Sequence, residues 1–272
     1  MKLKLTTSAK VNIGLFVFET RPDGYHNIQS LFYPVNEANS NLKGDIIEIE
    51  DGCFCGAGKV RLLQSGITIG GNVSDNICVK AYNLLDREFD LPPVKIYLEK
   101  NVPIGAGLGG GSADGTYMLK SLNEKFNLSL SEKQLHQFAE KLGSDCPFFV
   151  SNHPAFVEGR GEKINREIAI PSLSILEHCY FKIVSNDVFV STQRAYSLVS
   201  SRQLSDPANS LITKLQETPI DGWQGVIVND FEEPIFNEFP SLRAIKTQLL
   251  EEGAFYVSMT GSGSAVFGIF KK

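Results

Sequence analysis

The stretch Pro103-Ile-Gly-Ala-Gly-Leu-Gly-Gly-Gly-Ser-Ala-Asp114 decides how this chain is organised, because five of the seven residues from Gly105 to Gly111 are glycine. Apolar residues alternate upstream as in a β-strand and recur downstream at helical spacing. The strand positions are Val94, Ile96 and Leu98, and the helix positions are Met118, Leu119, Leu122 and Phe126. Bare backbone N–H groups at the start of a helix attract anions, so the stretch predicts a phosphate-binding loop.

The loop matches one dinucleotide-binding pattern, Gly105-x-Gly107-x-x-Gly110. That pattern requires a strand after the helix, ending in an acidic residue about 20 positions on. A second helix is expected instead over 131–142, and the nearest acid, Glu132, falls in its first turn. The sequence therefore argues against a dinucleotide fold.

The P-loop pattern also fits nearly, since Gly105 and Gly110 have the right spacing and Ser112 stands at the hydroxyl position. Gly111 replaces the lysine of that pattern. A cation for the phosphates must therefore come from elsewhere in the chain.

The composition is that of an ordinary globular protein, with 42% hydrophobic and 21% charged residues. The length of 272 residues predicts one large or two medium domains. No apolar run approaches the roughly 18 residues of a membrane span, and no signal peptide is visible, so a cytoplasmic protein is expected. The net charge of −5 without a basic block argues against nucleic acid. The scattered Cys53, Cys55, Cys78, Cys146 and Cys179 predict reduced thiols rather than disulfides or a zinc site.

Periodicity predicts the other elements. Strands are expected over 3–18 (one or two), 28–35, 45–50, 59–63, 67–69, 155–158, 179–184, 225–228, 255–258 and 266–270, and helices starting at 74–76 and over 131–142, 191–199, 206–216 and 241–252. An apolar strand is expected after Asp145, and 261–264 form a second glycine-rich turn. The pattern weakens over 162–178, which places a domain boundary near residue 166 and gives domains 1–166 and 167–272.

Two further stretches carry candidate chemistry. If Val11 and Ile13 face the core, Lys10 and Asn12 share the opposite face of a strand. Asp145 follows the end of a helix. The phosphate loop, together with Lys10 as the missing cation and Asp145 as a base, predicts phosphoryl transfer. An ion pair with Lys10 would keep Asp145 ionised. A solvated strand face and a simple turn aspartate remain the alternatives.

The turn Arg21-Pro-Asp-Gly-Tyr-His26 ends in an aromatic ring beside a titratable donor. Pro22 presets φ, and Gly24 is expected in the left-handed conformation. His26 could equally be a loop histidine without a ligand.

Three stretches in this order resemble the motifs of the galactokinase, homoserine kinase, mevalonate kinase and phosphomevalonate kinase (GHMP) superfamily: Ala9-Lys-Val-Asn12, Pro103–Ser112 and Met259-Thr-Gly-Ser-Gly-Ser264. Three others resemble its 4-diphosphocytidyl-2-C-methyl-D-erythritol kinase branch: Arg21-x-Asp-Gly-Tyr-His26, Gly143-Ser-Asp-Cys-Pro-Phe-Phe149 and Asn229-Asp-Phe-Glu232. The likeness covers nearly the whole chain.

The resemblance implies an α+β, two-domain GHMP kinase fold, with an N-terminal ribosomal S5-like domain, a C-terminal ferredoxin-like domain and the site in the cleft between them. It implies ATP- and Mg²⁺-dependent phosphorylation of the 2-hydroxyl of 4-diphosphocytidyl-2-C-methyl-D-erythritol, in the non-mevalonate route to isoprenoid precursors. It implies no nucleic-acid or membrane partner, and a monomer or weak homodimer. A sister GHMP kinase and a non-catalytic nucleotide-binding regulator are the alternatives.

The resemblance also assigns roles to single residues. Lys10 and Asp145 are the catalytic pair, with Asn12 beside them. The ATP phosphates are assigned to Pro103, Ile104, Gly105, Ala106, Gly107, Leu108, Gly109, Gly110, Gly111, Ser112 and Ala113, with Asn76 and Lys100 flanking the nucleotide pocket. The substrate is assigned to Tyr25, His26, Tyr196, Thr260 and Gly261, where two rings on the cytosine would contribute about 1–3 kcal/mol each. Ser112 is the candidate Mg²⁺ ligand.

Two positions depart from the pattern of many relatives. Ala113 stands where a second serine is common, so Ser112 serves alone. Gly115 stands where alanine is common and should cost the helix up to about 1 kcal/mol, with no compensation visible in the sequence.

Overall fold

The computed structural model describes residues 2–52, 58–204, 206 and 210–272. Packing divides the chain into two compact units that interleave in sequence. The first comprises residues 1–9, 43–104 and 109–152, and the second comprises 10–42, 105–108 and 153–272. The single domain boundary near residue 166 stays a prediction.

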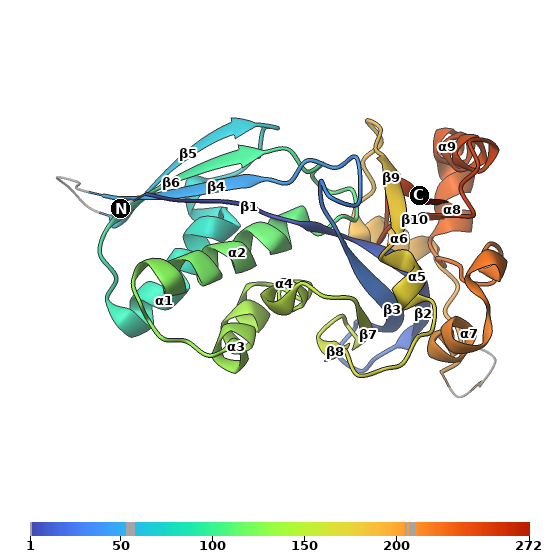
Figure 1. The fold of residues 1–272 in the computed structure, drawn as a ribbon. Coiled ribbons are helices and arrows are strands. Elements are labelled where there is room, and N and C mark those ends of the chain that lie inside the picture. The colour runs from blue at the N-terminus through green and yellow to red at the C-terminus, as the bar shows by residue number, and fades with distance from the viewer. Residues whose placement is uncertain (1, 53–57, 205, 207–209) are drawn as a thin grey trace. The chain divides into compact units, whose positions relative to one another are not determined.

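The first unit is a four-stranded sheet covered by helices on one face (Figure 1). Its strands lie in the order β1 (Leu3–Thr6), β4 (Ile46–Asp51), β6 (Val94–Lys100) and β5 (Val60–Gly66), antiparallel except for the parallel β5–β6 pair. Its helices are η1 (Val73–Asp75), α1 (Ile77–Phe89), α2 (Gly110–Lys125), α3 (Glu132–Leu142) and α4 (Phe148–Ser151).

The core of this unit forms because the inward residues of the strands meet the apolar faces of the helices. Ile47 and Ile96 from the sheet are fully buried in one cluster with Tyr82 from α1 and Met118 from α2. The strand before the glycine loop and the helix after it are therefore held firmly, so both ends of the loop are fixed.

Gly115 is explained by the contact between α1 and α2. A Cβ at Gly115 would lie 2.7 Å from Cγ1 of Ile77 and 3.3 Å from Cδ1 of Leu142. The missing methyl group lets the two side chains pack directly against α2, which offsets the low helix propensity of glycine.

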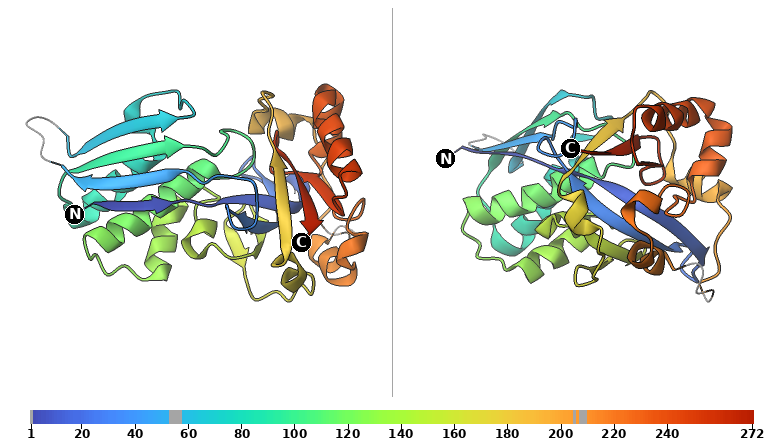
Figure 2. Two further views of the ribbon diagram at one scale, coloured as in Figure 1. Left: turned by 45° about the horizontal axis from the view of Figure 1, so that its top comes forward. Right: turned by 45° about the vertical axis from the view of Figure 1, so that its right-hand side comes forward.

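The second unit contains two sheets. One has the strand order β2 (Ala9–Thr20), β3 (His26–Val35), β7 (Ala155–Gly159) and β8 (Lys163–Asn165), and the other has the antiparallel order β10 (Tyr256–Met259), β11 (Val266–Lys271) and β9 (Cys179–Val184). Its helices are α5 (Leu173–Leu176), α6 (Thr192–Leu198), α7 (Leu211–Glu217), η3 (Ile220–Gly222), α8 (Glu232–Glu238) and α9 (Pro240–Glu251). Figure 2 shows the gold β9 beside the red C-terminal strands.

Most expected elements are present, and the second glycine turn joins β10 to β11. The capping box of Ser131 and Gln134 is formed, Gly143 donates to Ala139 at the end of α3, and Gly24 adopts φ +80°. Within the described residues no helix is long and apolar enough to cross a membrane.

Three expectations about elements were wrong. Residues 67–69 are not a strand, because β5 ends at Gly66. Residues 225–228 form a turn rather than a strand, and an isolated bridge joins Leu15 to the next residue, Asn229. The apolar segment after Asp145 is the helical turn α4 rather than a strand; its buried Phe148, Phe149 and Val150 give an apolar run too short for periodicity to separate the two.

The sequence also missed α8 and the short β8. Cys78, Cys146 and Cys179 are free and buried, as expected, whereas Cys53, Cys55 and part of the expected helix 206–216 lie outside the described residues.

Candidate active site

Lys10 and Asn12 lie on the same face of β2, as their spacing predicts. Lys10 is 3% exposed, and its Nζ donates to Oδ1 of Asn12 at 2.6 Å. The same ammonium lies 4.6 Å from the centre of the Phe32 ring on β3. A buried ammonium held between an amide oxygen and an aromatic face has a fixed direction, which is what charge stabilisation requires.

Asn12 connects Lys10 to the second glycine-rich turn. Its Oδ1 also accepts from the backbone N–H of Gly261 at 2.9 Å, and it lies 3.1 Å from Oγ1 of Thr260. Its Nδ2 donates to Oγ of Ser30 at 2.9 Å. The structure thus brings Lys10, Asn12, Thr260 and Gly261 together, although the hydroxyl and the N–H assigned to the substrate are engaged by Asn12.

The first glycine loop joins this group through its backbone. Lys10 donates its N–H to the carbonyl of Leu108 at 2.9 Å, and Oγ1 of Thr260 lies 3.0 Å from the carbonyl of Gly107. Gly107 has φ +77°, and a Cβ there would lie 2.0 Å from the carbonyl oxygen of Thr260. Only glycine allows the two turns to approach so closely.

The motif Asn229-Asp-Phe-Glu232 holds the second turn in place. Asn229 donates from Nδ2 to the carbonyls of Met259 at 2.7 Å and Gly261 at 2.9 Å. Oε1 of Glu232 accepts from the N–H of Met259 at 2.7 Å and from the Ser258 hydroxyl at 2.8 Å. The motif therefore holds the second turn in the position in which it contacts Asn12.

The start of α2 carries the other half of the predicted phosphate loop, in the first unit. Gly111 is exposed, and a Cβ there would meet nothing within 4 Å, so its backbone is open to a ligand. Ser112 is half-buried and lies against the Cys146 thiol, whose pKa burial raises to about 11. Ala113 is fully buried, so a serine hydroxyl at that position would lie in the core rather than at the ligand.

Asp145 is also in the first unit, half-buried in the turn between α3 and α4. The next residue, Cys146, accepts from the Thr116 hydroxyl at 2.8 Å, which fixes the turn to α2. Lys10 belongs to the second unit, so the pairing of Lys10 with Asp145 stays a prediction.

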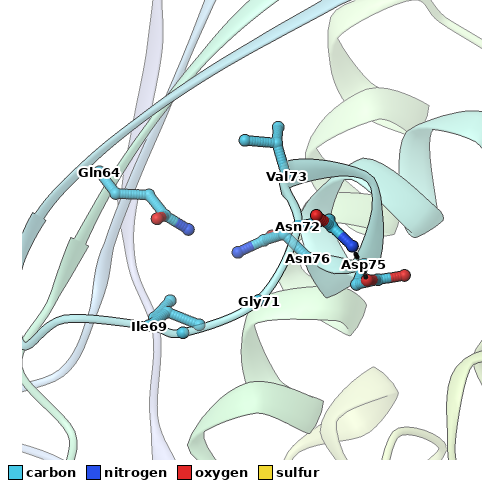
Figure 3. Close-up of a pocket in the computed structure, with 8 residues that line it drawn as sticks. Gln64, Ile69, Gly71, Asn72, Val73, Asp75 and Asn76 are labelled. Atoms are coloured by element: carbon cyan, nitrogen blue, oxygen red, sulfur yellow. Dashed lines mark hydrogen bonds between the residues drawn. The ribbon is translucent and has the colours of Figure 1, made fainter.

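Asn76 lines a pocket in the first unit, and the place of Lys100 beside the nucleotide stays a prediction. A pocket is lined by Gln64, Ile69, Gly70, Gly71, Asn72, Val73, Asp75 and Asn76, and Lys100 is not among its lining residues. In Figure 3, the side chains of Gln64 and Asn76 point toward one another across this pocket, from β5 and from the start of α1. Asn76 also caps α1, because its Oδ1 accepts from the N–H of Cys78 at 2.9 Å.

The Lys100 ammonium binds two carboxylates. Its Nζ bonds to Oδ2 of Asp45 and, at 2.9 Å, to Oδ2 of Asp114. The sequence analysis missed both acids. The available signal was an isolated aspartate beside a buried strand, Asp45, and another in the first turns of an apolar helix, Asp114.

The residues expected at a cytosine base lie in the second unit. The His26 ring stacks on Tyr196 at 5.1 Å between centroids, and Tyr196 meets Phe231 edge-on at 4.9 Å. Tyr25 is 57% exposed, and the Arg160 guanidinium lies 4.8 Å from its ring centre. Arg160 is a further residue that the sequence analysis missed, and the cytosine sandwich between Tyr25 and Tyr196 stays a prediction.

Hydrogen bonding fixes the neutral tautomer of His26. Its Nδ1 lies 2.6 Å from the carbonyl oxygen of Phe18, which can only accept, so the proton is on Nδ1. The lone pair of Nε2 is then an acceptor, with the Thr20 hydroxyl at 3.4 Å.

No group of three or more His, Cys, Asp or Glu side chains in the described part of the chain could hold a metal ion. Mg²⁺ in nucleotide sites is commonly held by phosphate oxygens and only one or two protein ligands. Such an ion needs few protein ligands, which fits a hydroxyl in the first turn of α2, and the assignment of Ser112 as that ligand stays a prediction.

Comparison with known proteins identifies the family. The models described as GHMP kinases N terminal domain and GHMP kinases C terminal match residues 76–154 and 212–272. The chain belongs to the GHMP kinases. Within them it belongs to the 4-diphosphocytidyl-2-C-methyl-D-erythritol kinases, by which name its curated relatives are known.

Two relatives and one solved structure support the assignment of this chain to these kinases. The kinase of Bacteroides thetaiotaomicron is 44% identical over 264 residues, covering 97% of this chain and 90% of the relative. That of Bacteroides fragilis is 43% identical over 263 residues, with the same coverage. A crystal structure of 4-(cytidine 5'-diphospho)-2C-methyl-D-erythritol kinase aligns with a TM-score of 0.74 at 29% identity, covering 98% of this chain and 90% of that one.

Proposed function

We propose that this GHMP kinase transfers the γ-phosphoryl group of ATP to the 2-hydroxyl of 4-diphosphocytidyl-2-C-methyl-D-erythritol. The observation that carries the proposal is the convergence on Asn12 of the Lys10 ammonium and the second glycine turn, with the first glycine loop bonded to the same group. The names of its relatives supply the acceptor.

The chemistry divides between positioning and charge. In the reaction the acceptor oxygen forms a bond to the γ-phosphorus, the bond from that phosphorus to the bridging oxygen of ADP breaks, and Asp145 takes the hydroxyl proton. Lys10 stabilises the negative charge on the transferring group, a function that suits an ammonium aligned by Asn12. Mg²⁺ held by the phosphates and Ser112 would supply further neutralisation.

The pocket beside Asn76 is the proposed site of the adenine ring. Ile69 and Val73 offer apolar surface, while the Gln64 and Asn76 amides can donate and accept at a base edge. Because Asn76 caps α1 and α1 packs on α2, the pocket has a fixed place relative to the proposed phosphate-binding end of α2.

The rings near the start of β3 are the proposed cytosine site. One face of Tyr25 is covered by Arg160, which leaves the other face for the base. His26 would accept at Nε2 from the exocyclic amine of cytosine, whereas uracil presents an acceptor there. This tautomer therefore predicts preference for the cytidyl over the uridyl compound.

The first experiment measures ATP turnover by the purified protein with the cytidyl substrate, its uridyl analogue, galactose, homoserine and mevalonate. Turnover confined to the cytidyl substrate is expected. Turnover of another acceptor would make the chain a sister GHMP kinase, and ATP binding without any turnover would favour a regulator.

Asp145→Asn tests the base. The variant should lose at least about 100-fold in kcat while its ATP affinity stays close to that of the wild type. Full turnover by this variant would remove Asp145 from the mechanism. Lys10→Ala should likewise slow the chemical step more than it weakens binding.

Tyr25→Ala and Arg160→Leu test the cytosine site. Both should raise KM for the cytidyl substrate, by about 5-fold or more for Tyr25→Ala, which loses a stacking face, and by less for Arg160→Leu. KM for ATP should not change in either. Equal effects on both substrates would contradict the assignment, and Lys163→Ala on β8 serves as the control for loss of a nearby cation.

A further inference from the structure

Asp230, the second residue of the motif 229–232, forms an ion pair with Arg202. The Nε and Nη2 groups of Arg202 donate to Oδ2 and Oδ1 of Asp230, each at 2.6 Å. The two side chains are 24% and 10% exposed, and the guanidinium lies 3.7 Å from the centre of the buried Phe16 ring. A bidentate and stacked pair has one preferred geometry, unlike the single contact of an exposed ion pair. The pair is therefore suited to hold the backbone around it in place.

The ion pair closes the outer edge of β2, which is the end strand of its sheet. Leu15 donates its N–H to the carbonyl of Val228 and accepts from the N–H of Asp230, both at 2.9 Å. At Val17, Oδ2 of Asp230 accepts from the N–H at 2.9 Å, and the carbonyl accepts from the N–H of Arg202 at 2.8 Å. Both backbone groups of Val17 are thus bound by the two partners of the ion pair.

The residue after Val17 orients His26. Successive residues of a strand point their backbone groups to opposite edges, so the Phe18 carbonyl faces β3. Nδ1 of His26, the first residue of β3, lies 2.6 Å from that carbonyl oxygen. The place of the carbonyl therefore depends on how the ion pair holds Val17.

A second hydrogen-bonding group lies beside the same ring nitrogen. The hydroxyl of Ser201, the residue before Arg202, is 3.5 Å from Nδ1 of His26. A carbonyl can only accept, so its contact at 2.6 Å keeps the proton on Nδ1, whereas a hydroxyl donates or accepts and so permits either tautomer. The tautomer of His26 therefore depends on the carbonyl staying the closer partner.

The ion pair is also connected to the second ring of the proposed cytosine site. Phe231, next to Asp230, meets Tyr196 edge-on at 4.9 Å, and Tyr196 stacks on His26 at 5.1 Å between centroids. Arg202 follows a few residues after α6, the helix that carries Tyr196. Both rings are thus joined to the ion pair through short stretches of backbone.

We infer that Arg202 and Asp230 are positioning residues that set the specificity of the proposed base-binding site. Their ion pair keeps the Phe18 carbonyl on Nδ1 of His26 and so leaves Nε2 as an acceptor, which matches the exocyclic amine of cytosine and not the carbonyl oxygen of uracil. Without the pair, the Ser201 hydroxyl replaces the carbonyl as the partner, Nε2 can carry the proton, and the preference for cytosine weakens. The inference rests on the proposed function, because it assumes that the base lies against His26.

The tautomer of His26 is measured by ¹⁵N NMR at about pH 9, where an ordinary histidine is neutral. The two ring nitrogens give separate signals, and the signals lost in His26→Gln are assigned to this residue among the four histidines of the chain. In the wild type the proton is expected on Nδ1, and in Arg202→Gln it should be shared between both nitrogens. A proton on Nε2 in the wild type, or one that stays wholly on Nδ1 in the variant, would overturn the inference.

The kinetic test compares KM for ATP, for the cytidyl substrate and for its uridyl analogue. Arg202→Gln should raise KM for the cytidyl substrate about 3- to 10-fold, the contribution of one neutral hydrogen bond, and should lower the preference in kcat/KM for cytidyl over uridyl by a similar factor. KM for ATP should not change. Arg194→Gln is the matched control, because it breaks only the exposed ion pair with Glu238 and should follow the wild type.

A merely structural role would lower Tm and weaken the use of both nucleotide compounds equally, so equal losses would overturn the inference. Asp230→Asn breaks the same ion pair but keeps an oxygen that can accept from the N–H of Val17. The same change of tautomer and preference is expected in it, which keeps the test decisive if Arg202→Gln does not fold. A wild type that turns over neither compound, while the tautomer still changes in the variants, would count against the proposed function and leave the orientation of His26 by the ion pair standing.

Discussion

Replacing Asn12 by alanine should both loosen the second unit and slow the reaction. The side chain is 1% exposed, and its Oδ1 accepts from the Lys10 ammonium at 2.6 Å and from the Gly261 N–H at 2.9 Å. The Thr260 hydroxyl can turn wholly to the carbonyl of Gly107, which lies 3.0 Å away, so little is lost there. The main cost therefore comes from one charged donor and one backbone donor, because the Ser30 hydroxyl loses the Asn12 amide as a donor but keeps its own bond to the carbonyl of Gly14.

The magnitude follows from those two donors. Loss of an acceptor costs about 1–3 kcal/mol for a buried neutral donor and more for a charged one. Water entering the vacated space would recover part of this, so we expect a loss of about 3 kcal/mol. For a chain of this size that corresponds to a fall in Tm of about 6–12 °C.

The assay pairs thermal unfolding with steady-state kinetics at a temperature well below both transitions. Asn12→Ala should also lower kcat, because the ammonium of Lys10 is no longer aligned. The matched control is Asn123→Ala in the first unit, which loses two hydrogen bonds to Leu130 and should lower Tm with kcat unchanged. A fall in Tm below about 2 °C would refute the view that Asn12 holds this group together.

Three further predictions concern single positions. Gly107→Ala should abolish activity and lower Tm, since a Cβ would lie 2.0 Å from the Thr260 carbonyl oxygen; wild-type behaviour in thermal unfolding would contradict this contact. Gly115→Ala should destabilise by about 1 kcal/mol despite better helix propensity, because overpacking against Ile77 outweighs it, and Ile77→Ala in the same chain should reverse the sign of the substitution. Burial raises the pKa of Asp114 to about 8, which means that the unfolded chain ionises first, so urea unfolding should show stability falling from about pH 4 to about pH 8. Asp114→Asn should lack that component.

Local order was readable from the sequence wherever one pattern dominated. The capping box at Ser131, the strand before the glycine loop and the helix after it all follow from spacing of a few residues. The turn at Gly24 follows equally from local backbone preference. The prediction at Phe148 and Phe149 was wrong because a run of three apolar residues fits a strand and a helical turn equally well.

The hydrogen bonds between the side chains of the site could not be predicted from the sequence. Lys100 was predicted to flank the nucleotide pocket, but its bonds to Asp45, which lies 55 residues away, and to Asp114 were not predicted. The assignment of Thr260 and Gly261 to the substrate stays a prediction, and their bonds to Asn12 were not predicted. Such pairings depend on which segments the fold brings together, and propensity and periodicity carry no information on that. The presence of glycine at position 115 could not be explained from the sequence either, because the side chain that leaves no room for a Cβ there lies on another helix.

The bond between the Gly261 N–H and Asn12 joins residues 249 positions apart. During synthesis, a ribosome must therefore release nearly the whole chain before Asn12 finds this partner and the Lys10 ammonium acquires its final setting. A nascent or truncated chain that ends before this turn has the phosphate loop and the lysine but lacks the contact that aligns them. Such a chain should therefore lack the alignment of the Lys10 ammonium that the complete chain has.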